Sequence, residues 1–482
     1  MKKKILFFII PILIFSQEFE SNLPIILIQT GGNEILDETR IICDMGIINY
    51  FNKLNNLSDP FNNYNGKISI ELRGSSSQQF FPKKSYSLET QTVDGENNNV
   101  SLLDLPKEND WILHGPYSDK TLIRNNLTFF LSREMGNYSP RSIYCELFID
   151  NDYRGVYMLT EKIKRDKNRV NIKEIKDGDL TGGYIIKIDK LTDSPENSSW
   201  CSNMTNFNND PICFQYHYPK ADEITLDQKY YIENYINEIN TLIKDLAQNQ
   251  TNIELIENIE FTSFIDYMII SELSKNVDGY RLSTFLYKDT DENNGKLNMG
   301  PVWDYNLSFG NVDFCQSSKI SGWVLEENTP CRGSIPNYWY DLLKNDSFRL
   351  KLTNRWSELR QNVLSFDNIF NHIDSVSQHI NIAQSRNFEL WDILDSYIWP
   401  NYQLGVTYQD EVSFLKHWIY NRINWIDNNI NNFRLVFPDC TSSEKKLIEI
   451  VNQLGQKTNP ISNEILFYIY DNGCVEQQFI YD

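Results

Sequence analysis

The chain has 482 residues, of which 41% are hydrophobic and 13% aromatic, so it can bury a substantial core and is not a disordered chain. Its formal net charge of −20 excludes an extended nucleic-acid groove, because contact with many phosphates requires a basic surface. The composition therefore indicates a globular protein whose few basic clusters serve local purposes.

The first residues predict export of the chain. Lys2, Lys3 and Lys4 precede an apolar run over residues 5–15, which is too short to span a bilayer. This pattern is typical of a signal peptide, here residues 1–17. No second apolar run follows that could form a membrane span.

Eight cysteines in an exported chain favour disulfides. Cys201 and Cys213 bracket a short Asn-rich loop, and Cys315 and Cys331 bracket a polar one, so we expect these two bridges. A zinc site is the alternative, but the sequence has no CxxC pair and no histidine at ligand spacing.

The first half of the chain predicts strands joined by a Gly/Ser loop. Residues 67–73 alternate apolar and polar side chains, and a second strand begins near residue 84. Small residues between two strands let backbone N–H groups approach an anion, so this loop is a candidate phosphate-covering flap, with an ordinary hairpin loop as the alternative. The candidate anion-binding residues are Arg73, Gly74, Ser75, Ser76, Ser77, Lys83 and Lys84.

Later segments change from β-rich to α-rich. After a predicted helix over 118–136, residues 143–160 form a hairpin and residues 182–188 another strand. An irregular insertion is expected at about 191–223. Helical periodicity then dominates in four regions, namely 226–246, 262–273, 348–386 and 411–433. The order predicts a bilobal α+β fold.

Two acids are expected to converge near residue 300. Asp278 follows the helix over 262–273, and Asp304 follows the second strand of a hairpin whose strands are residues 283–287 and 296–302. Asp304 also lies within an apolar stretch, which is a poor place for an uncommitted charge. Solvated acids at the ends of a hairpin are the alternative.

These segments resemble the CotH family of secreted, atypical protein kinases. The motifs that carry the resemblance are Val277-Asp278-Gly279-Tyr280-Arg281, Gly300-Pro301-Val302-Trp303-Asp304-Tyr305-Asn306, Arg73-Gly74-Ser75-Ser76-Ser77, Phe81-Pro82-Lys83-Lys84, and Arg124-Asn125. The resemblance implies an atypical protein-kinase-like fold over residues 18–438, with an N-lobe over about 18–162 and a C-lobe over 163–438. It also implies ATP and Mg²⁺ as cofactors.

The resemblance also implies roles for individual residues. Asp278 would orient the acceptor hydroxyl, and Asp304 would hold Mg²⁺ together with the positions of Asn306 and Ser283. Arg73 and Lys83 or Lys84 would contact phosphates beneath the Ser loop, and Glu161 and Lys162 would lie at the hinge beside the base. Ser283 replaces a common Asn and Asn306 a common Asp, and both are weaker magnesium ligands than a full carboxylate set.

The last residues predict a separate β tail over 439–482, with strands at 465–470 and 475–480. Its order of motifs resembles the C-terminal sorting signal of the Bacteroidetes type IX secretion system. That resemblance implies the type IX machinery as a partner and a secreted or cell-surface location. A terminal hairpin packed on the main domain is the alternative.

The expected function is transfer of the ATP γ-phosphate to a Ser/Thr hydroxyl of a protein outside the cell or on its surface. A catalytically degenerate pseudokinase, acting as a nucleotide-binding or adhesion module, is the alternative because of Ser283 and Asn306. A carbohydrate-active enzyme using Asp278 and Asp304 ranks last, because the Ser loop with its basic frame has no role there.

Overall fold

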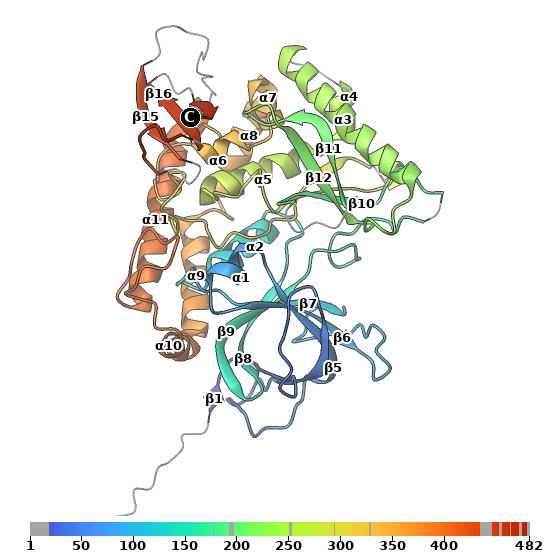
Figure 1. The fold of residues 1–482 in the computed structure, drawn as a ribbon, viewed down its shortest axis with the longest axis vertical. Coiled ribbons are helices and arrows are strands. Elements are labelled where there is room, and N and C mark those ends of the chain that lie inside the picture. The colour runs from blue at the N-terminus through green and yellow to red at the C-terminus, as the bar shows by residue number, and fades with distance from the viewer. Residues whose placement is uncertain are drawn as a thin grey trace, which may run out of the picture.

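The computed structural model describes residues 19–176, 178–191, 197–249, 253–293, 295–326, 329–433, 446–452, 456–462, 464–471 and 475–479. These residues form an α+β structure in which a closed β-barrel lies against a region of helices and one open sheet (Figure 1). We call these two regions the barrel part and the helical part. The expected signal peptide lies outside the described residues.

The barrel part closes in the strand order β2-β3-β5-β6-β7-β9-β8. Its alternating apolar side chains, among them Ile68, Leu88 and Leu147, fill the interior. Only the β2–β8 pair among the barrel pairings is parallel. The strands are β2 (Ile25–Gln29), β3 (Ile41–Ile48), β5 (Tyr64–Arg73), β6 (Ser85–Gln91), β7 (Asp110–His114), β8 (Ser142–Ile149) and β9 (Asp152–Glu161). A small ladder joins β1 (Glu20–Ser21) to β4 (Asn55–Asn56).

The helical part contains a five-stranded sheet in the order β11-β12-β10-β13-β14. Its neighbouring strands are all antiparallel. The strands are β10 (Tyr184–Ile188), β11 (Ser199–Thr205), β12 (Pro211–Tyr218), β13 (Thr284–Lys288) and β14 (Leu297–Met299). The expected hairpin beyond Asp278 therefore closes, as β13 with β14.

Helices surround this sheet and complete the large hydrophobic core. Helix α5 is its centre, because twelve of its residues, Ser263 to Ser274, are buried. The longer helices are α2 (Arg124–Glu134), α3 (Leu226–Asn249), α5 (Phe261–Ser274), α8 (Asp346–Arg360), α9 (Phe366–His379), α10 (Asn381–Leu390) and α11 (Tyr408–Asn429). The shorter ones are α1 (Ser76–Phe80), α4 (Ile253–Asn258), α6 (Pro330–Gly333) and α7 (Tyr338–Lys344), with 3₁₀ turns η1 (Asp291–Asn293) and η2 (Ile430–Asn432).

Three segments differ from the expectations. The Gly/Ser loop contains the short helix α1. Helix α2 begins at Arg124 and not near residue 118, because Leu122 has a φ of 61° and Asp119 accepts a hydrogen bond from the Arg124 N–H. The segment expected to be an irregular insertion holds β11 and β12, which pair with each other and join the sheet through β10.

Both expected disulfides are confirmed. Cys201 bonds to Cys213 across the β11–β12 pair, and Cys315 bonds to Cys331. Of the other cysteines in the described chain, Cys43 and Cys145 are free and buried in the barrel.

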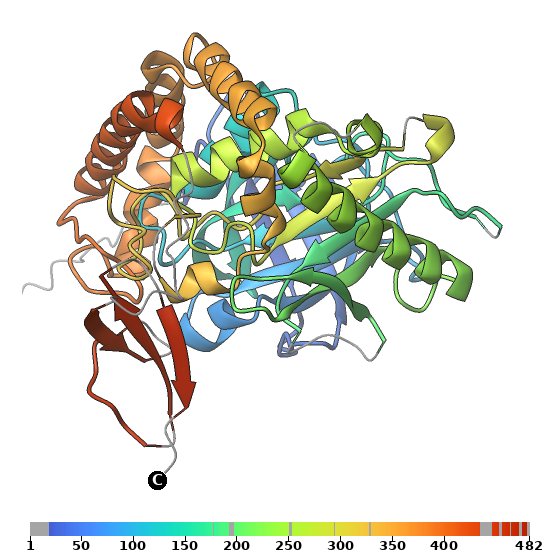
Figure 2. The same cartoon turned by 90° about the horizontal axis from the view of Figure 1, so that it is seen from above.

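The C-terminal strands form their own sheet, β15-β16-β17, at the edge of the molecule in both ribbon views (Figures 1 and 2). The strands are β15 (Leu447–Val451), β16 (Ile465–Tyr470) and β17 (Val475–Phe479), so the last two lie where the sequence predicts them. Throughout the described ranges, no helix combines the length and apolar character needed to cross a membrane.

Candidate functional site

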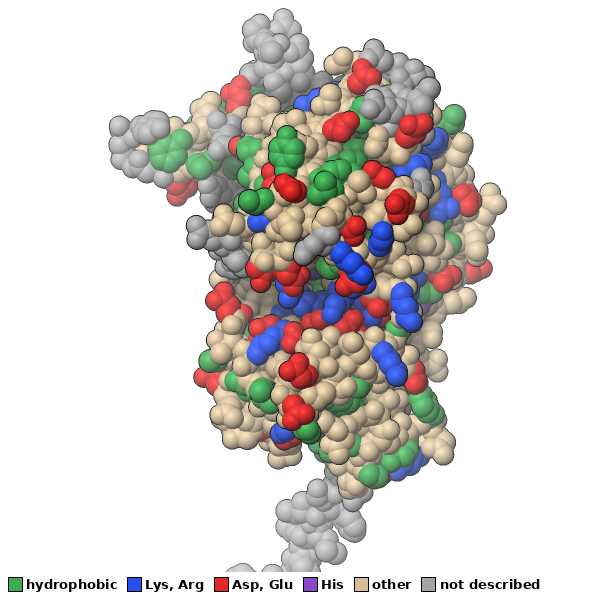
Figure 3. Space-filling view, turned by 90° about the vertical axis from the view of Figure 1, so that its right-hand side faces the viewer, with side chains coloured by type: hydrophobic (Ala, Val, Ile, Leu, Met, Phe, Trp, Pro, Cys, Tyr) green, Lys and Arg blue, Asp and Glu red, His purple; other side chains and the backbone are tan. Residues whose placement is uncertain are grey.

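A cavity of about 1490 Å³ lies between the barrel part and the helical part. We call it the central pocket. Its volume exceeds the roughly 300–1,000 Å³ of a small-molecule site, so it can hold more than one substrate at once. It brings together nine of the predicted site residues: Arg73, Gly74, Ser75, Ser76, Ser77, Asp278, Ser283, Asp304 and Asn306. On the face shown in Figure 3, basic and acidic side chains gather along the middle of the molecule.

Asp278 is positioned by the end of helix α5. The helix stops at Lys275, whose φ of 46° is left-handed, and the chain then turns back toward β13. The Asp278 N–H donates to Asn276 Oδ1 at 3.2 Å, which fixes this turn. Arg281 Nη2 lies 2.8 Å from Asp278 Oδ1, so the carboxylate is oriented by a charge-assisted bond at the pocket wall.

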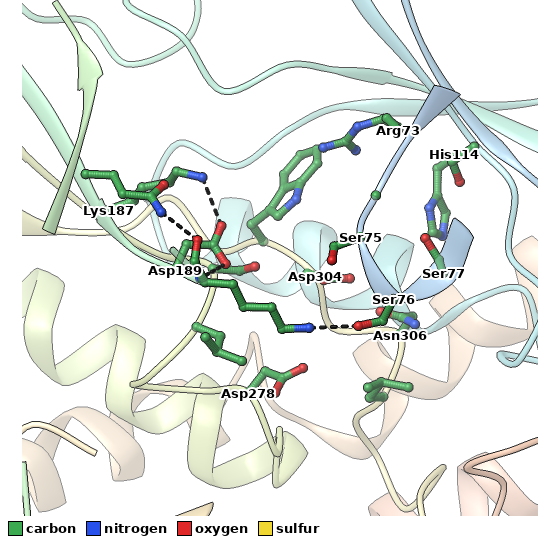
Figure 4. Close-up of a pocket in the computed structure, with 18 of the residues that line it drawn as sticks. Arg73, Ser75, Ser76, Ser77, His114, Lys187, Asp189, Asp278, Asp304 and Asn306 are labelled. Atoms are coloured by element: carbon green, nitrogen blue, oxygen red, sulfur yellow. Dashed lines mark hydrogen bonds and ion pairs between the residues drawn. The ribbon is translucent and has the colours of Figure 1, made fainter. Parts of the chain in front are cut away.

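Asp304 follows β14 and lies in the same pocket as Asp278 (Figure 4). Its φ of 64° is left-handed, a strained conformation that is often found in functional loops. The surface of Asp304 is open to the pocket, yet the protein around it excludes enough water to raise the pKa of the carboxyl to about 6. The negative charge of Asp278 raises this pKa further, and Arg73 opposes the rise.

Helix α2 holds the loop that carries Asp304. Asn125 Oδ1 accepts a hydrogen bond from the Tyr305 N–H at 2.6 Å, immediately after Asp304. Arg124 Nε donates to Ser308 O at 2.9 Å, and its guanidinium is fixed by Asp119 at 2.6 Å. Both α2 side chains are buried, so Arg124 and Asn125 hold the Asp304 loop against helix α2.

The Gly/Ser loop covers one wall of the pocket. Gly74 has a φ of 95°, and a Cβ at this position would overlap Ser77 Oγ, so the close turn into α1 requires glycine. The Arg73 guanidinium lies 5.4 Å from the Trp303 ring centroid, a cation–π distance. Burial lowers the pKa of Arg73, but a guanidinium remains charged, so it presents a cation to the pocket.

Four predicted residues do not line the central pocket. Lys83 is buried and donates 2.7 Å bonds to Val156 O and Asn387 Oδ1. Lys84 donates to Gln78 O and Phe81 O, where it neutralises the carboxyl end of α1.

The other two are at the end of β9. Glu161 is buried between Arg141, at 2.7 Å, and Arg169, at 3.3 Å. Lys162 lies 3.3 Å from Asp110. Their predicted roles beside the nucleotide have no support from these contacts.

Sequence reasoning missed three charged residues at the end of β10. Lys187 and Asp189 form a 2.9 Å ion pair, and Lys190 Nζ donates to Ser76 Oγ at 2.7 Å (Figure 4). All three line the central pocket. A signal was present, because Lys187 interrupts an otherwise apolar strand and a strand-internal charge needs a partner.

The pocket also contains a neutral histidine. His114 Nε2 accepts a 3.3 Å bond from Asn125 Nδ2, and burial, followed by the charge of Arg73, lowers the pKa of His114 to about 4. His114 is therefore uncharged at neutral pH. It contacts Asn125, the residue that holds the Asp304 loop.

The donor set fits magnesium bound together with phosphates. Mg²⁺ usually takes one or two carboxylates and completes its octahedron with water and substrate phosphates. Asp304 would provide the carboxylate, and Asn306 and Ser283, which line the same pocket, would provide neutral oxygens. In the part of the chain that the structure describes, no three His, Cys, Asp or Glu side chains form an all-protein cage.

Comparison with known proteins identifies the family of the chain. The family model CotH kinase protein matches residues 70–426, which include every predicted site residue. The inner spore coat protein H of Bacillus subtilis (strain 168) is 23% identical over 198 residues, 41% of this chain and 49% of that protein. The alignment thus spans about half the length of this relative. The chain belongs to the CotH kinase protein family.

Proposed function

We propose that this chain is a magnesium-dependent protein kinase that transfers the γ-phosphate of ATP to a Ser/Thr hydroxyl of a protein outside the cell or on its surface. One observation carries the proposal: Asp278 and Asp304 line a single pocket beneath the Gly74–Ser77 loop, with cations around them. Phosphoryl transfer needs this kind of positioning and charge neutralisation more than it needs covalent catalysis.

In this scheme the two acids have different roles. Asp278 orients the acceptor hydroxyl and takes its proton as the new O–P bond forms and the bond to the β–γ bridging oxygen breaks. Asp304 would be the carboxylate ligand of the metal, with Asn306 and Ser283 as neutral ligands. A bound Mg²⁺ would supply charge neutralisation for the phosphates. Arg73 and the Ser75–Ser77 hydroxyls and N–H groups hold the phosphates from the barrel side.

The proposal assigns the barrel part to the N-lobe and the helical part to the C-lobe of a kinase-like arrangement. The nucleotide then lies in the central pocket, between the two parts. Thr160 and Met158 of β9 line this pocket, so β9 is the best candidate for the hinge beside the nucleotide base. Glu161 and Lys162 form ion pairs with Arg141 and Asp110 outside the pocket.

We also propose that the protein works outside the cytoplasm. The two disulfides fit an oxidising compartment. The signal peptide over 1–17 and the sorting tail over 439–482, read by the type IX machinery, remain predictions from the sequence. The compact β15-β16-β17 sheet is compatible with such a tail.

A specific observation favours a second candidate, a nucleotide-binding pseudokinase. Ser283 and Asn306 replace stronger ligands, which leaves Asp304 as the carboxylate at the metal. Binding of Mg·ATP would survive in such a protein, whereas phosphoryl transfer would not.

The experiment that separates the two candidates uses γ-labelled ATP and a Ser-rich acceptor protein, with Asp278→Asn as the comparison. The proposal expects label transfer by wild type and a loss of roughly 100-fold or more in the variant, the usual scale for a positioned acid–base group. Binding of Mg·ATP by wild type without any transfer, to itself or to the acceptor, would establish the pseudokinase.

A further inference from the structure

Lys190 follows strand β10, and both its backbone N–H and its backbone carbonyl are hydrogen-bonded. Its N–H donates to Asp189 Oδ1 at 3.0 Å, and its carbonyl accepts a 2.7 Å bond from Gln215 Nε2 of β12. Gln215 is only 6% exposed. The backbone of Lys190 is therefore held at the edge of the pocket, and the bond of its ammonium to Ser76 gives the direction of the side chain.

The ammonium of Lys190 reaches the opposite wall of the central pocket. It donates to Ser76 Oγ at 2.7 Å, and Ser76 is the first residue of α1, in the connection between β5 and β6 (Figure 4). The ammonium therefore lies beside the Ser loop, in the pocket that Asp278 and Asp304 also line.

The hydrogen bond to Ser76 is a weak interaction for an ammonium group. A lysine has three N–H donors, and a neutral hydroxyl is a weaker acceptor for them than a phosphate oxygen is. The other cations near the acids are engaged with carboxylates or a ring: Lys187 with Asp189, Arg281 with Asp278, and Arg73 with Trp303. Lys190 is therefore the lysine best placed to exchange its partner for an anion.

We propose that Lys190 binds the terminal phosphate of the nucleotide, and that its bond to Ser76 holds the ammonium at that phosphate subsite until the nucleotide arrives. The inference rests on the proposed function and adds the phosphate-binding lysine to it. During transfer Lys190 moves no proton. It neutralises charge on the phosphoryl oxygens while the bridging oxygen leaves with ADP and Asp278 takes the acceptor proton.

The test is a calorimetric titration of ATP, ADP and AMP, each with Mg²⁺, into wild type and Lys190→Met. Loss of a charge-assisted bond to the terminal phosphate should weaken ATP binding by about 10- to 100-fold. AMP binding should stay within about twofold, because its single phosphate is not the terminal one of ATP. Lys190→Arg should restore part of the ATP affinity, since it keeps the charge.

Lys229→Met is the matched control. Lys229 lines the same pocket from α3, but its ammonium lies over the Tyr216 ring, 5.2 Å from the centroid. This variant should bind ATP as wild type does.

Two results overturn the inference while the proposed function stands: equal weakening of ATP and AMP in Lys190→Met, or unchanged ATP affinity. If wild type binds no Mg·ATP, both the proposed function and the inference are wrong.

Discussion

Asn125→Ala should show whether the hydrogen bond from Tyr305 to Asn125 positions Asp304 for Mg·ATP binding or only stabilises the fold. Asn125 Oδ1 is the acceptor for the N–H of Tyr305, at 2.6 Å, and Tyr305 is 1% exposed. Truncation to alanine leaves this N–H without its acceptor in a place that bulk water does not reach. Asp304, one residue earlier, has a left-handed φ of 64°, so we expect it to depend on the hydrogen bond that holds the loop.

The size of the effect of Asn125→Ala can be worked out from the lost hydrogen bond to Tyr305. An unsatisfied buried N–H costs about 1–3 kcal/mol, and the left-handed backbone of a non-glycine residue adds a similar strain. If the loop keeps its position, the free energy of unfolding falls by about 1–3 kcal/mol. If the loop relaxes instead, Asp304 leaves its place, and Mg·ATP affinity falls about 5- to 150-fold for the same free energy.

The assay pairs urea denaturation with Mg·ATP calorimetry, and Asn126→Ala is the control. Asn126 is the next residue of α2, but it bonds to Ser142 at 3.3 Å and to His372 at 2.8 Å, away from Asp304. It should lose stability without a change in nucleotide affinity. The reasoning is refuted if Asn125→Ala alters neither quantity, or if both variants lower Mg·ATP affinity equally.

Three further predictions concern charge, packing and cross-linking. Because the pKa of Asp304 is about 6, Mg·ATP affinity should fall about tenfold per pH unit below pH 6 as the carboxylate gains a proton, and an affinity that stays constant in titrations from pH 5 to 8 would contradict this. Lys83→Met should lower the free energy of unfolding by about 1–3 kcal/mol, since Val156 O and Asn387 Oδ1 each lose a hydrogen bond from the ammonium. An effect on Mg·ATP affinity would instead return Lys83 to the phosphate site. Cys315→Ser should lower the free energy of unfolding by about 3 kcal/mol, because the bond to Cys331 closes a loop with a sequence separation of 16, and unchanged denaturation under non-reducing conditions would contradict this.

The convergence of Asp278 and Asp304 could be predicted from the sequence because it depends on local features. A helix end, a hairpin and its turn residues fix both acids within one short stretch. The same holds for Cys201 and Cys213, which face each other across neighbouring strands.

The lysines could not be assigned in this way, because their directions depend on contacts between distant segments. Lys83 points to Asn387, which is 304 positions further along the chain, and Lys190 points to Ser76, 114 positions earlier. Composition and spacing show that the Ser loop is framed by cations. Only the packing of α10 and β10 decides which of those cations face the pocket.

Strand pairing explains the misjudged insertion as well. Residues 199–218 contain Asn-rich and polar stretches, so their β character is weak locally. They become β11 and β12 because β10 offers an edge and the Cys201–Cys213 bond holds the hairpin in register.

The most direct test of the central claim is binding of ATP to wild type and Asp304→Asn with and without Mg²⁺, measured by calorimetry. Asn tolerates a left-handed φ as Asp does, so the variant should keep its fold and its circular dichroism spectrum. The account predicts magnesium-dependent ATP binding by wild type and its loss in Asp304→Asn. Equal binding by both proteins, or binding by wild type that needs no magnesium, would contradict it.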